Sequence, residues 1–278
     1  PFGTQKNVNK REGYLIVALA WFAMVTFGSL PYYFSDVCTQ FSDMFFESVS
    51  GFTTTGATIF VDIESLPSSI LLWRSLTQWI GGMGIIVLTV AILPLLGIGG
   101  IQLFAAEAPG PTSDKIHPRI QGTAKRLWLI YVALSILLMV ILYFEGMTAF
   151  DALNHGLTTM ATGGFSTKNN SIAFYNSPLI QYTICLFMLL AGTNYSVIYF
   201  GLRGRFKNVW KNDEFRFYVL IVAMFTFLIT AGIIHRSDFS LEESFRGALF
   251  QVISIITTTG YITVDYTIFS PFVTIAFF

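Results

Sequence analysis

Thr53-Thr54-Thr55-Gly56-Ala57 is the first of three short threonine–glycine clusters in this chain. The other two read Ala161-Thr162-Gly163-Gly164-Phe165 and Thr257-Thr258-Thr259-Gly260-Tyr261. Each cluster follows an apolar segment too short to cross a membrane, and lies between segments long enough to cross one. Cation channels use this order of helix, half-helix, glycine turn and helix to present backbone carbonyls to a dehydrated ion. The repetition within one chain predicts a pore built from pseudo-symmetric repeats.

The composition of the chain indicates that its solvent is the lipid bilayer. Hydrophobic residues make up 54% of the sequence and charged residues only 12%, whereas an ordinary soluble domain is about 25% charged. The expected fold is therefore an all-α integral membrane protein, in which tandem span–pore-helix–span repeats of the potassium-channel type surround a central pore. The two cysteines, Cys38 and Cys185, lie far apart and outside any metal-ligand spacing, so neither a disulfide nor a zinc site is expected.

Hydropathy divides the chain into long and short apolar segments. The segments long enough to span a bilayer are 13–34, 71–98, 127–144, 178–202 and 215–234. A sixth begins near Ser270. The shorter segments are 41–51, 149–160 and 241–256. Because non-spanning backbone at membrane depth must be enclosed by protein or line a wet cavity, we expect these three to be re-entrant half-helices.

Placing Gly56, Gly164 and Gly260 in register reveals an internal repeat. Threonine stands two residues before each glycine, and a polar residue stands nine residues before it, within an apolar run. The repeats predicted from this register cover residues 1–110, 111–206 and 207–278. The third repeat is expected to be truncated and the chain to be a piece of a longer protein, because it opens at Pro1 without a methionine and stops inside an apolar run.

The glycine clusters are the predicted ion-binding site. A cation that leaves water needs oxygen ligands of comparable strength, and consecutive inward carbonyls can supply them where glycine opens otherwise forbidden backbone conformations. The residues predicted to form this selectivity filter are Thr54, Thr55, Gly56, Ala57, Thr162, Gly163, Gly164, Phe165, Thr258, Thr259, Gly260 and Tyr261. The carbonyls predicted to bind the ion are those of Thr54, Thr55, Thr162, Gly163, Thr258 and Thr259.

Polar residues around the clusters have two interpretations each. Glu47, His155 and Gln251, the polar residues at the ninth position before each glycine, either support the filter by hydrogen bonds from behind or serve only a local network. Arg74 is expected to pair with a nearby acid such as Asp62 or Glu64 rather than to handle ions. Asn194 either lines the cavity below the filter or bridges two helices.

The distribution of charge predicts the orientation. Most of the basic residues lie in the N-terminal lead and in the two loops that connect the repeats, which predicts that this face is cytoplasmic. These residues are Lys6, Lys10, Arg11, Lys115, Arg119, Lys125, Arg126, Arg203, Arg205, Lys207, Lys211 and Arg216. The acids gather on the side of the half-helices, where they either concentrate cations at an outer mouth or simply keep short loops soluble. They are Asp36, Asp43, Glu47, Asp62, Glu64, Glu145, Asp151, Asp238, Glu242, Glu243 and Asp265.

The three glycine clusters resemble the degenerate filter sequences of the TrkH/Ktr/HKT superfamily of potassium transporters. The run Gln78-Trp79-Ile80-Gly81-Gly82-Met83-Gly84-Ile85, continued by Ala106-Glu107-Ala108-Pro109-Gly110-Pro111, resembles the bacterial TrkH branch most. The resemblance covers essentially the whole chain. It implies a multi-pass subunit of the bacterial inner membrane with four repeats around one pore, so that a fourth repeat and leading helices are expected outside this sequence.

The resemblance also implies the ion, the partners and the gate. It implies that potassium crosses the pore, that no organic cofactor is bound, that the subunit forms a homodimer, and that its basic loops dock a cytoplasmic nucleotide-binding RCK-type ring subunit, TrkA. In the plant branch, serine at the first filter glycine accompanies sodium preference, so Gly56 favours potassium. Gly163 departs from the Thr-Thr-Gly pattern, which predicts a filter of only approximate four-fold symmetry. The family's gating loop falls just beyond Ser270, so no gating residue is assigned.

Rival functions fit the sequence less well. A proton- or sodium-coupled cation symporter with a midplane site also has glycine-interrupted spans, but it predicts inverted repeats, whereas these repeats run in the same sense. A voltage-gated channel needs regularly spaced arginines in a span, and none occurs. An enzyme needs an intramembrane catalytic motif, and His117, His155 and His235 are single and dispersed. Neither an enzymatic activity nor a nucleic-acid partner is expected.

Overall fold

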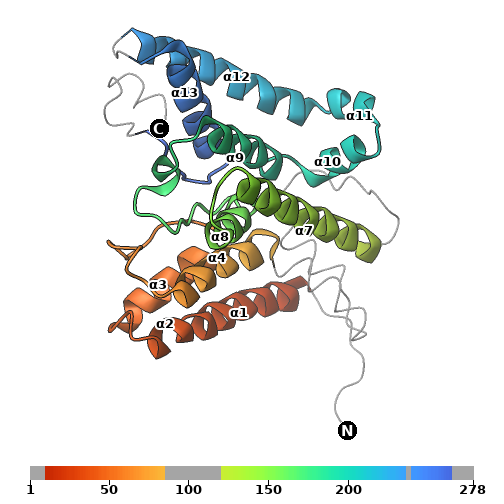
Figure 1. Cartoon of the computed structure of the whole chain (residues 1–278). Helices are drawn as coiled ribbons and strands as arrows, with labels where there is room; N and C mark the ends of the chain where they lie inside the picture. The colour runs from red at the N-terminus through yellow and green to blue at the C-terminus, as the bar shows by residue number, and fades with distance from the viewer. Residues whose placement is uncertain (1–9, 85–119, 236–238, 265–278) are drawn as a thin grey trace.

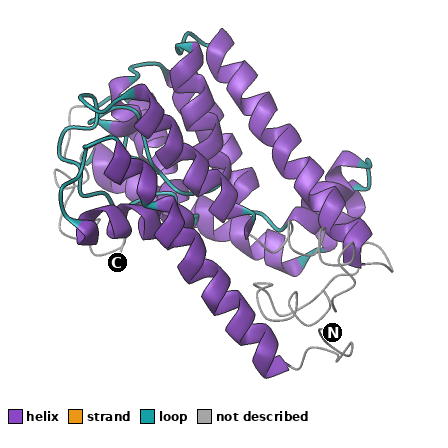
Figure 2. Ribbon diagram, turned by 90° about the horizontal axis from the view of Figure 1, so that it is seen from below, coloured by secondary structure: helices purple, strands orange, loops and turns teal. Residues whose placement is uncertain are grey.

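The computed structural model describes residues 10–84, 120–235 and 239–264, and within these ranges every regular element is a helix (Figures 1 and 2). The expected all-α class is confirmed. Three helical segments are long and apolar enough to cross a membrane, namely Leu15–Phe34, Lys125–Phe144 and Asp213–Ile234. Only 22–28% of their most apolar windows is buried inside the protein, so most of their surface is free to face lipid.

The first group of helices comprises α1 (Lys10–Gly28), α2 (Leu30–Phe34), α3 (Phe41–Phe52) and α4 (Ser68–Gly82). The expected span 13–34 is interrupted at Ser29, because Pro31 stands in the first turn of α2 and has no amide hydrogen for a continuous ladder. The half-helix α3 runs one residue beyond its predicted end. Of the expected span 71–98, the part after Gly84 lies outside the described residues.

The second group comprises α7 (Ile120–Phe144), α8 (Ala149–Met160), the short 3₁₀ helix η1 (Ser171–Phe174), α9 (Pro178–Ala191) and α10 (Tyr195–Leu202). The prediction of one unbroken span over 178–202 is wrong. The amide of Gly192 donates to the Met188 carbonyl and closes α9, and the Thr193 hydroxyl donates to the Leu189 carbonyl at 2.8 Å. Glycine and a backbone-bonding threonine both weaken a helix, so the chain breaks there despite its apolar composition.

The third group comprises α11 (Phe206–Lys211), α12 (Asp213–Ile234) and α13 (Leu241–Ile256). The half-helix α13 begins with a capping box, in which the Ser240 hydroxyl accepts from the Glu243 amide and the Glu243 carboxylate accepts from the Ser240 amide. These hydrogen bonds lower the pKa of Glu243. The sixth expected span lies outside the described residues.

The half-helices pack against the long helices, and the middle one lies inside the molecule (Figure 1). The middle half-helix, α8, is almost fully buried from Asn154 to Met160. It contacts α4, α7 and α9, and it shares one apolar core with residues of α7, α9, α12 and α13. The chain thus encloses short helices behind longer ones, as bilayer-depth backbone that does not span requires.

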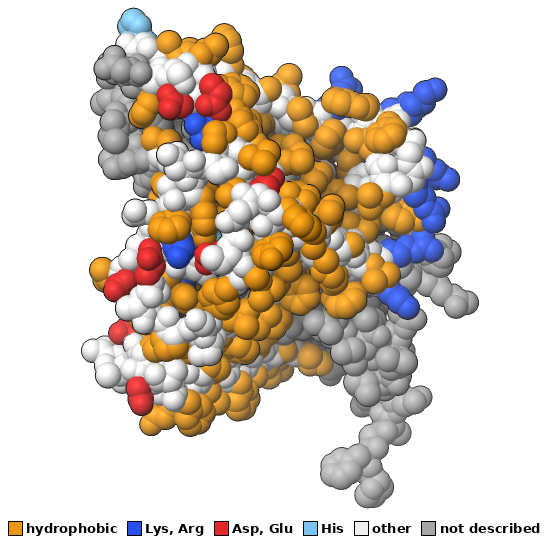
Figure 3. All heavy atoms as spheres, viewed as in Figure 1, with side chains coloured by type: hydrophobic (Ala, Val, Ile, Leu, Met, Phe, Trp, Pro, Cys, Tyr) orange, Lys and Arg blue, Asp and Glu red, His pale blue; other side chains and the backbone are white. Residues whose placement is uncertain are grey.

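Charged side chains separate toward two ends of the molecule. In the view of Figure 3, Lys and Arg gather at the right, over α10, α11 and the start of α7, whereas Asp and Glu gather at the left, beside the half-helix ends. The exposed bases of the segment between α10 and α12 include Arg203, Arg205 and Lys207. The two faces expected from the sequence therefore differ in charge; that the basic face is cytoplasmic stays a prediction.

Candidate functional site

The three glycine clusters share one unusual backbone conformation. The threonines two residues before each glycine have φ of 55°, 51° and 57°, and the glycines have φ of 79°, 76° and 81°. These residues are Thr54, Thr162 and Thr258, followed by Gly56, Gly164 and Gly260. A positive φ is uncommon for any residue other than glycine. Its recurrence at the same register marks the clusters as copies of one turn.

Hydrogen bonds tie each cluster back to its own half-helix in the same way. The amide immediately before the glycine donates to a carbonyl in the last turns of the helix, five residues earlier, in all three copies. The bonds are Thr55 to Ser50 at 2.9 Å, Gly163 to Thr158 at 2.9 Å and Thr259 to Ser254 at 2.8 Å. The half-helices therefore end in closely similar turns, which hold the clusters at their C-terminal ends.

Neighbouring clusters meet through a glycine and a carbonyl. A Cβ atom at Gly56 would lie 2.2 Å from the carbonyl oxygen of Gly163, and one at Gly164 would lie 1.9 Å from the carbonyl oxygen of Thr259. Gly163 and Thr259 occupy the same position in successive clusters, immediately before the glycine. The structure thus brings together the first cluster with the second and the second with the third, with one repeated contact. Around Gly260, no described atom lies within 4 Å of such a Cβ.

The aromatic residues that follow two of these glycines reach back to the preceding repeat. Phe165 is buried, and the Arg74 guanidinium carbon lies 4.1 Å from its ring centroid. Tyr261 is also buried; its hydroxyl forms a short hydrogen bond with the Thr158 hydroxyl and accepts from the Thr159 hydroxyl at 3.3 Å. The second cluster is therefore also anchored on α4, and the third on the half-helix α8.

The chain matches the family described as TrkH, cation transport protein, over residues 2–278. The chain belongs to the TrkH family. The family is one of membrane-embedded transport proteins, so this TrkH-family chain is not an enzyme, and the resemblance found in its sequence is confirmed.

Known relatives cover the chain almost completely. It is 47% identical over 263 residues to the Trk system potassium uptake protein TrkH of Escherichia coli strain K12, covering 92% of this chain and 54% of the relative. It is 38% identical over 263 residues to TrkG of the same strain, covering 94% and 54%. The crystal structure of the potassium transporter TrkH from Vibrio parahaemolyticus superposes with a TM-score of 0.82 at 36% identity, over 99% of this chain and 57% of the other. The chain spans about half the length of these relatives.

Glu47 lies behind the first glycine cluster of this TrkH-family chain. Its carboxylate accepts from the Thr58 hydroxyl at 2.9 Å, the Ile59 amide at 3.1 Å and Nε of Arg74 at 2.8 Å. The expectation that Arg74 pairs with Asp62 or Glu64 is wrong. Arg74 is 1% exposed, and a buried guanidinium needs a buried partner, which Glu47 of α3 supplies across the helix interface.

His155 occupies the corresponding place behind the second cluster. Its Nδ1 lies 2.8 Å from the Asp151 carbonyl and therefore donates, which leaves Nε2 to accept from the Ser166 hydroxyl at 2.9 Å. Ser166 follows Gly164 by two residues, as Thr58 follows Gly56. Gln251 is buried at the third position, and its Oε1 has no hydrogen-bond partner among the described residues. A role of the three in supporting the filter remains a prediction.

Sequence reasoning missed Gln78 of α4. Its Nε2 donates to the Gly163 carbonyl at 2.6 Å, and its Oε1 accepts from the Phe165 amide at 3.2 Å. A signal was present in the sequence, because an amide side chain stands in an apolar span and the second cluster lacks hydroxyl groups at two positions where the others carry threonine.

The loops that follow the first two glycine clusters are joined through Asn169. Its side chain accepts from the Ile63 backbone amide at 2.7 Å and donates to the Asp62 carboxylate at 3.0 Å. The backbone amide of Asn169 donates to the Glu64 carboxylate at 3.2 Å. The hydrogen bond from Asn169 is the largest cause of the lowered pKa of Asp62. Asp62 and Glu64, two acids of the predicted mouth, thus also join the two loops through hydrogen bonds, in addition to any effect on cations.

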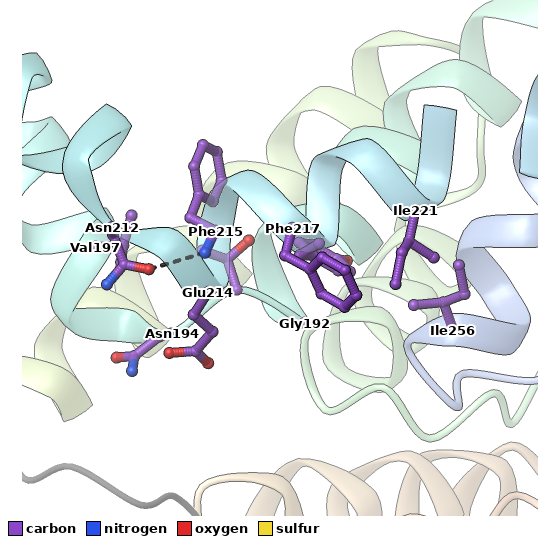
Figure 4. Close-up of a pocket in the computed structure, with 11 residues that line it drawn as sticks. Gly192, Asn194, Val197, Asn212, Glu214, Phe215, Phe217, Ile221 and Ile256 are labelled. Atoms are coloured by element: carbon purple, nitrogen blue, oxygen red, sulfur yellow. Dashed lines mark hydrogen bonds between the residues drawn. The ribbon is translucent and has the colours of Figure 1, made fainter. Parts of the chain in front are cut away.

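Asn194 lies in the break between α9 and α10. It borders a pocket of about 270 Å³ between this break and the start of α12, together with Gly192, Glu214 and Phe215 (Figure 4). The pocket also reaches Ile256 at the end of the third half-helix. Asn194 is therefore near both α12 and the third cluster, and its two interpretations, as a cavity-lining or a helix-bridging residue, both remain open.

Proposed function

We propose that the complete protein takes up potassium through a selective, gated transmembrane pore. The repeated contact between a glycine of one cluster and a carbonyl of the next carries this proposal, since it gathers the clusters around a common space. The names of the relatives, potassium uptake proteins, support the choice of ion. Potassium is here the transported substrate.

The proposed selectivity filter consists of the glycine clusters themselves. Carbonyl oxygens replace the hydration shell of the ion, and the positive φ values at alternate positions allow successive carbonyls to point inward, as extended or helical backbone does not. The proposed ion ligands are the carbonyls of Thr54, Thr55, Thr162, Gly163, Thr258 and Thr259. Glu47 and His155 hold the first two segments from behind, through the Ile59 amide and the Ser166 hydroxyl, and Gln251 has the same role in the third by its register.

We further propose the assembly around this pore. Residues 1–110, 111–206 and 207–278 each form one repeat, and a fourth repeat, which the resemblance to the family implies, closes the ring. The subunit forms a homodimer in the bacterial inner membrane, with its basic face in the cytoplasm. That face docks the nucleotide-binding TrkA-type ring, and the exposed bases around α11 supply the charge for it.

Ion flux through the full-length protein in proteoliposomes tests the proposal. Potassium, rubidium, sodium and lithium are compared with no imposed proton or sodium gradient. A saturable, downhill potassium and rubidium flux that exceeds sodium flux is the expected result. Flux that appears only with a proton or sodium gradient overturns the pore and supports the alternative, a coupled symporter with a midplane binding site.

A further inference from the structure

The first and third glycine clusters are braced by a pair of hydroxyl groups. The hydroxyls of Thr53 and Thr55 lie 2.8 Å apart, and those of Thr257 and Thr259 lie 2.8 Å apart. The second cluster has Ala161 and Gly163 at these two positions, so it has no such pair. Its backbone must be held by something else, because the conformation is the same as in the other two.

Gln78 occupies the volume of the missing side chain. A Cβ atom at Gly163 would lie 2.3 Å from Cδ of Gln78. The Gln78 amide bonds both sides of Gly164, with Nε2 on the Gly163 carbonyl and Oε1 on the Phe165 amide. The carbonyl of Gly163 can only accept and the amide of Phe165 can only donate. The side-chain nitrogen of Gln78 must therefore face Gly163 and its oxygen must face Phe165. Gln78 is fully buried, and its hydrogen bonds are shielded from water.

The interface between α9 and the third cluster differs from the one between α4 and the second cluster. Gly82 of α4 and Gly192 after α9 occupy equivalent places, because each lies against the first residue of a cluster. A Cβ at Gly82 would lie 2.8 Å from Ala161, and a Cβ at Gly192 would lie 2.7 Å from Thr257. Four residues before Gly192 stands Met188, which is fully buried in the apolar core. The polar Gln78 therefore meets the small residues of the second cluster, whereas the apolar Met188 stands at the corresponding register position before Gly192.

We infer that Gln78 is a positioning residue that holds the Gly163 carbonyl and the Phe165 amide in place of the missing hydroxyl pair, and so sets the ion preference of the second filter segment. The inference rests on the proposed function, since it requires that this segment bind ions. The amide occupies one lone pair of the Gly163 carbonyl and leaves the second free. The second segment thus presents a carbonyl of different strength and stiffness from its counterparts.

The test compares variants of the full-length protein in proteoliposomes, with the ratio of potassium to sodium flux as the readout. Gln78→Met introduces the residue that α9 has at the corresponding position, Met188. It keeps the side-chain volume and removes the hydrogen bonds to the Gly163 carbonyl and the Phe165 amide. We expect it to lower the ratio about fivefold, the factor that one hydrogen bond of ordinary strength represents. The matched control is Gln181→Met, since Gln181 is a buried glutamine of α9 that bonds Tyr175 and Arg246 away from the clusters. It should leave the ratio unchanged.

Rescue separates positioning from simple packing. The triple variant Gln78→Met/Ala161→Thr/Gly163→Thr rebuilds at this interface what the third repeat has, and we expect it to restore the ratio to within about twofold. Gly163→Thr alone should abolish flux, because Gln78 still fills the space. If Gln78→Met folds poorly, Gln78→Leu replaces it: the side chain stays apolar and branched but can neither donate to the Gly163 carbonyl nor accept from the Phe165 amide, so the ratio must again fall.

The outcomes distinguish this inference from the proposed function. A wild-type ratio in Gln78→Met or Gln78→Leu, or a triple variant no better than Gln78→Met, overturns the role of Gln78 if Gly56→Ser still changes the ratio. A wild-type ratio in both the Gln78 and the Gly56 variants overturns the filter itself.

Discussion

Nε of Arg74 lies 2.8 Å from Oε1 of Glu47, and neither side chain reaches solvent. The pair joins α4 to the half-helix α3, and both partners also bond Thr58, two residues beyond the first cluster glycine. Burying two charges is costly even when they are paired, so the pair stabilises the fold less than its geometry suggests. Its effect is to fix the backbone after Gly56 through hydrogen bonds that no surface residue can replace.

Glu47→Gln should destabilise the protein strongly, because it leaves the Arg74 guanidinium buried without a counter-charge. The expected loss in the free energy of unfolding is about 3–5 kcal/mol, measured by thermal or denaturant unfolding in detergent. The control is Glu242→Gln, which breaks the more exposed pair with Arg246 and should cost at most about 1 kcal/mol. Equal losses in the two variants would contradict the assignment of a structural role to the buried pair.

Replacing Gly56 by serine should lower the preference for potassium over sodium. The new Cβ would lie 2.2 Å from the Gly163 carbonyl oxygen, and the residue would keep a φ of 79° that serine rarely adopts. The carbonyl must therefore move. Gly204→Ser is the matched control, since Gly204 has a φ of 68° and no described atom within 4 Å of its Cβ position. Relative permeability that changes equally in both variants would show that backbone strain alone is responsible.

The half-helices and their ends were the most predictable part of the fold. Segments 149–160 and 241–256 match α8 and α13, because Thr148 and Ser240 cap their first turns and a Thr-Gly turn ends each one. The break after Ala191 was not predicted, since a hydropathy window averages over Gly192 and its neighbours.

Contacts between distant residues were the least predictable part of the candidate site. The pairing of Arg74 was predicted from acids close along the chain, whereas α3 and α4 bring Glu47 to it across 27 residues. Gln78 meets Gly163 across 85 residues. The register of the clusters could be predicted because it recurs three times in the sequence. The side chains that hold the clusters differ from repeat to repeat, so predicting them requires knowing how the helices pack.

Asn169→Ala should loosen the junction between the first two outer loops without altering the ion preference. The variant removes the hydrogen bonds to Asp62 and Ile63. These bonds are exposed, so the expected loss of stability is below about 1 kcal/mol. Limited proteolysis of the loop around residue 62 should become faster, and Ser65→Ala in the same loop, which removes one local hydrogen bond, is the control. An altered ratio of potassium to sodium flux in Asn169→Ala would mean that the loops act on the filter.

Tyr261→Phe should weaken the link between the third cluster and the second half-helix. The variant keeps the buried ring but removes the hydroxyl that bonds Thr158 and Thr159. Thr158 retains the Asn154 carbonyl at 3.0 Å as a partner, but the buried Thr159 hydroxyl loses its bond to Tyr261, so the loss should be about 1–3 kcal/mol. Because the ring follows Gly260 directly, the loss should reach the filter as a few-fold lower ratio of potassium to sodium flux. Tyr182→Phe removes a hydroxyl whose partner is the Glu242 carboxylate in the first turn of α13, at the other end of that half-helix from the cluster, and should keep the wild-type ratio. Equal ratios in the two variants would place Tyr261 outside the filter.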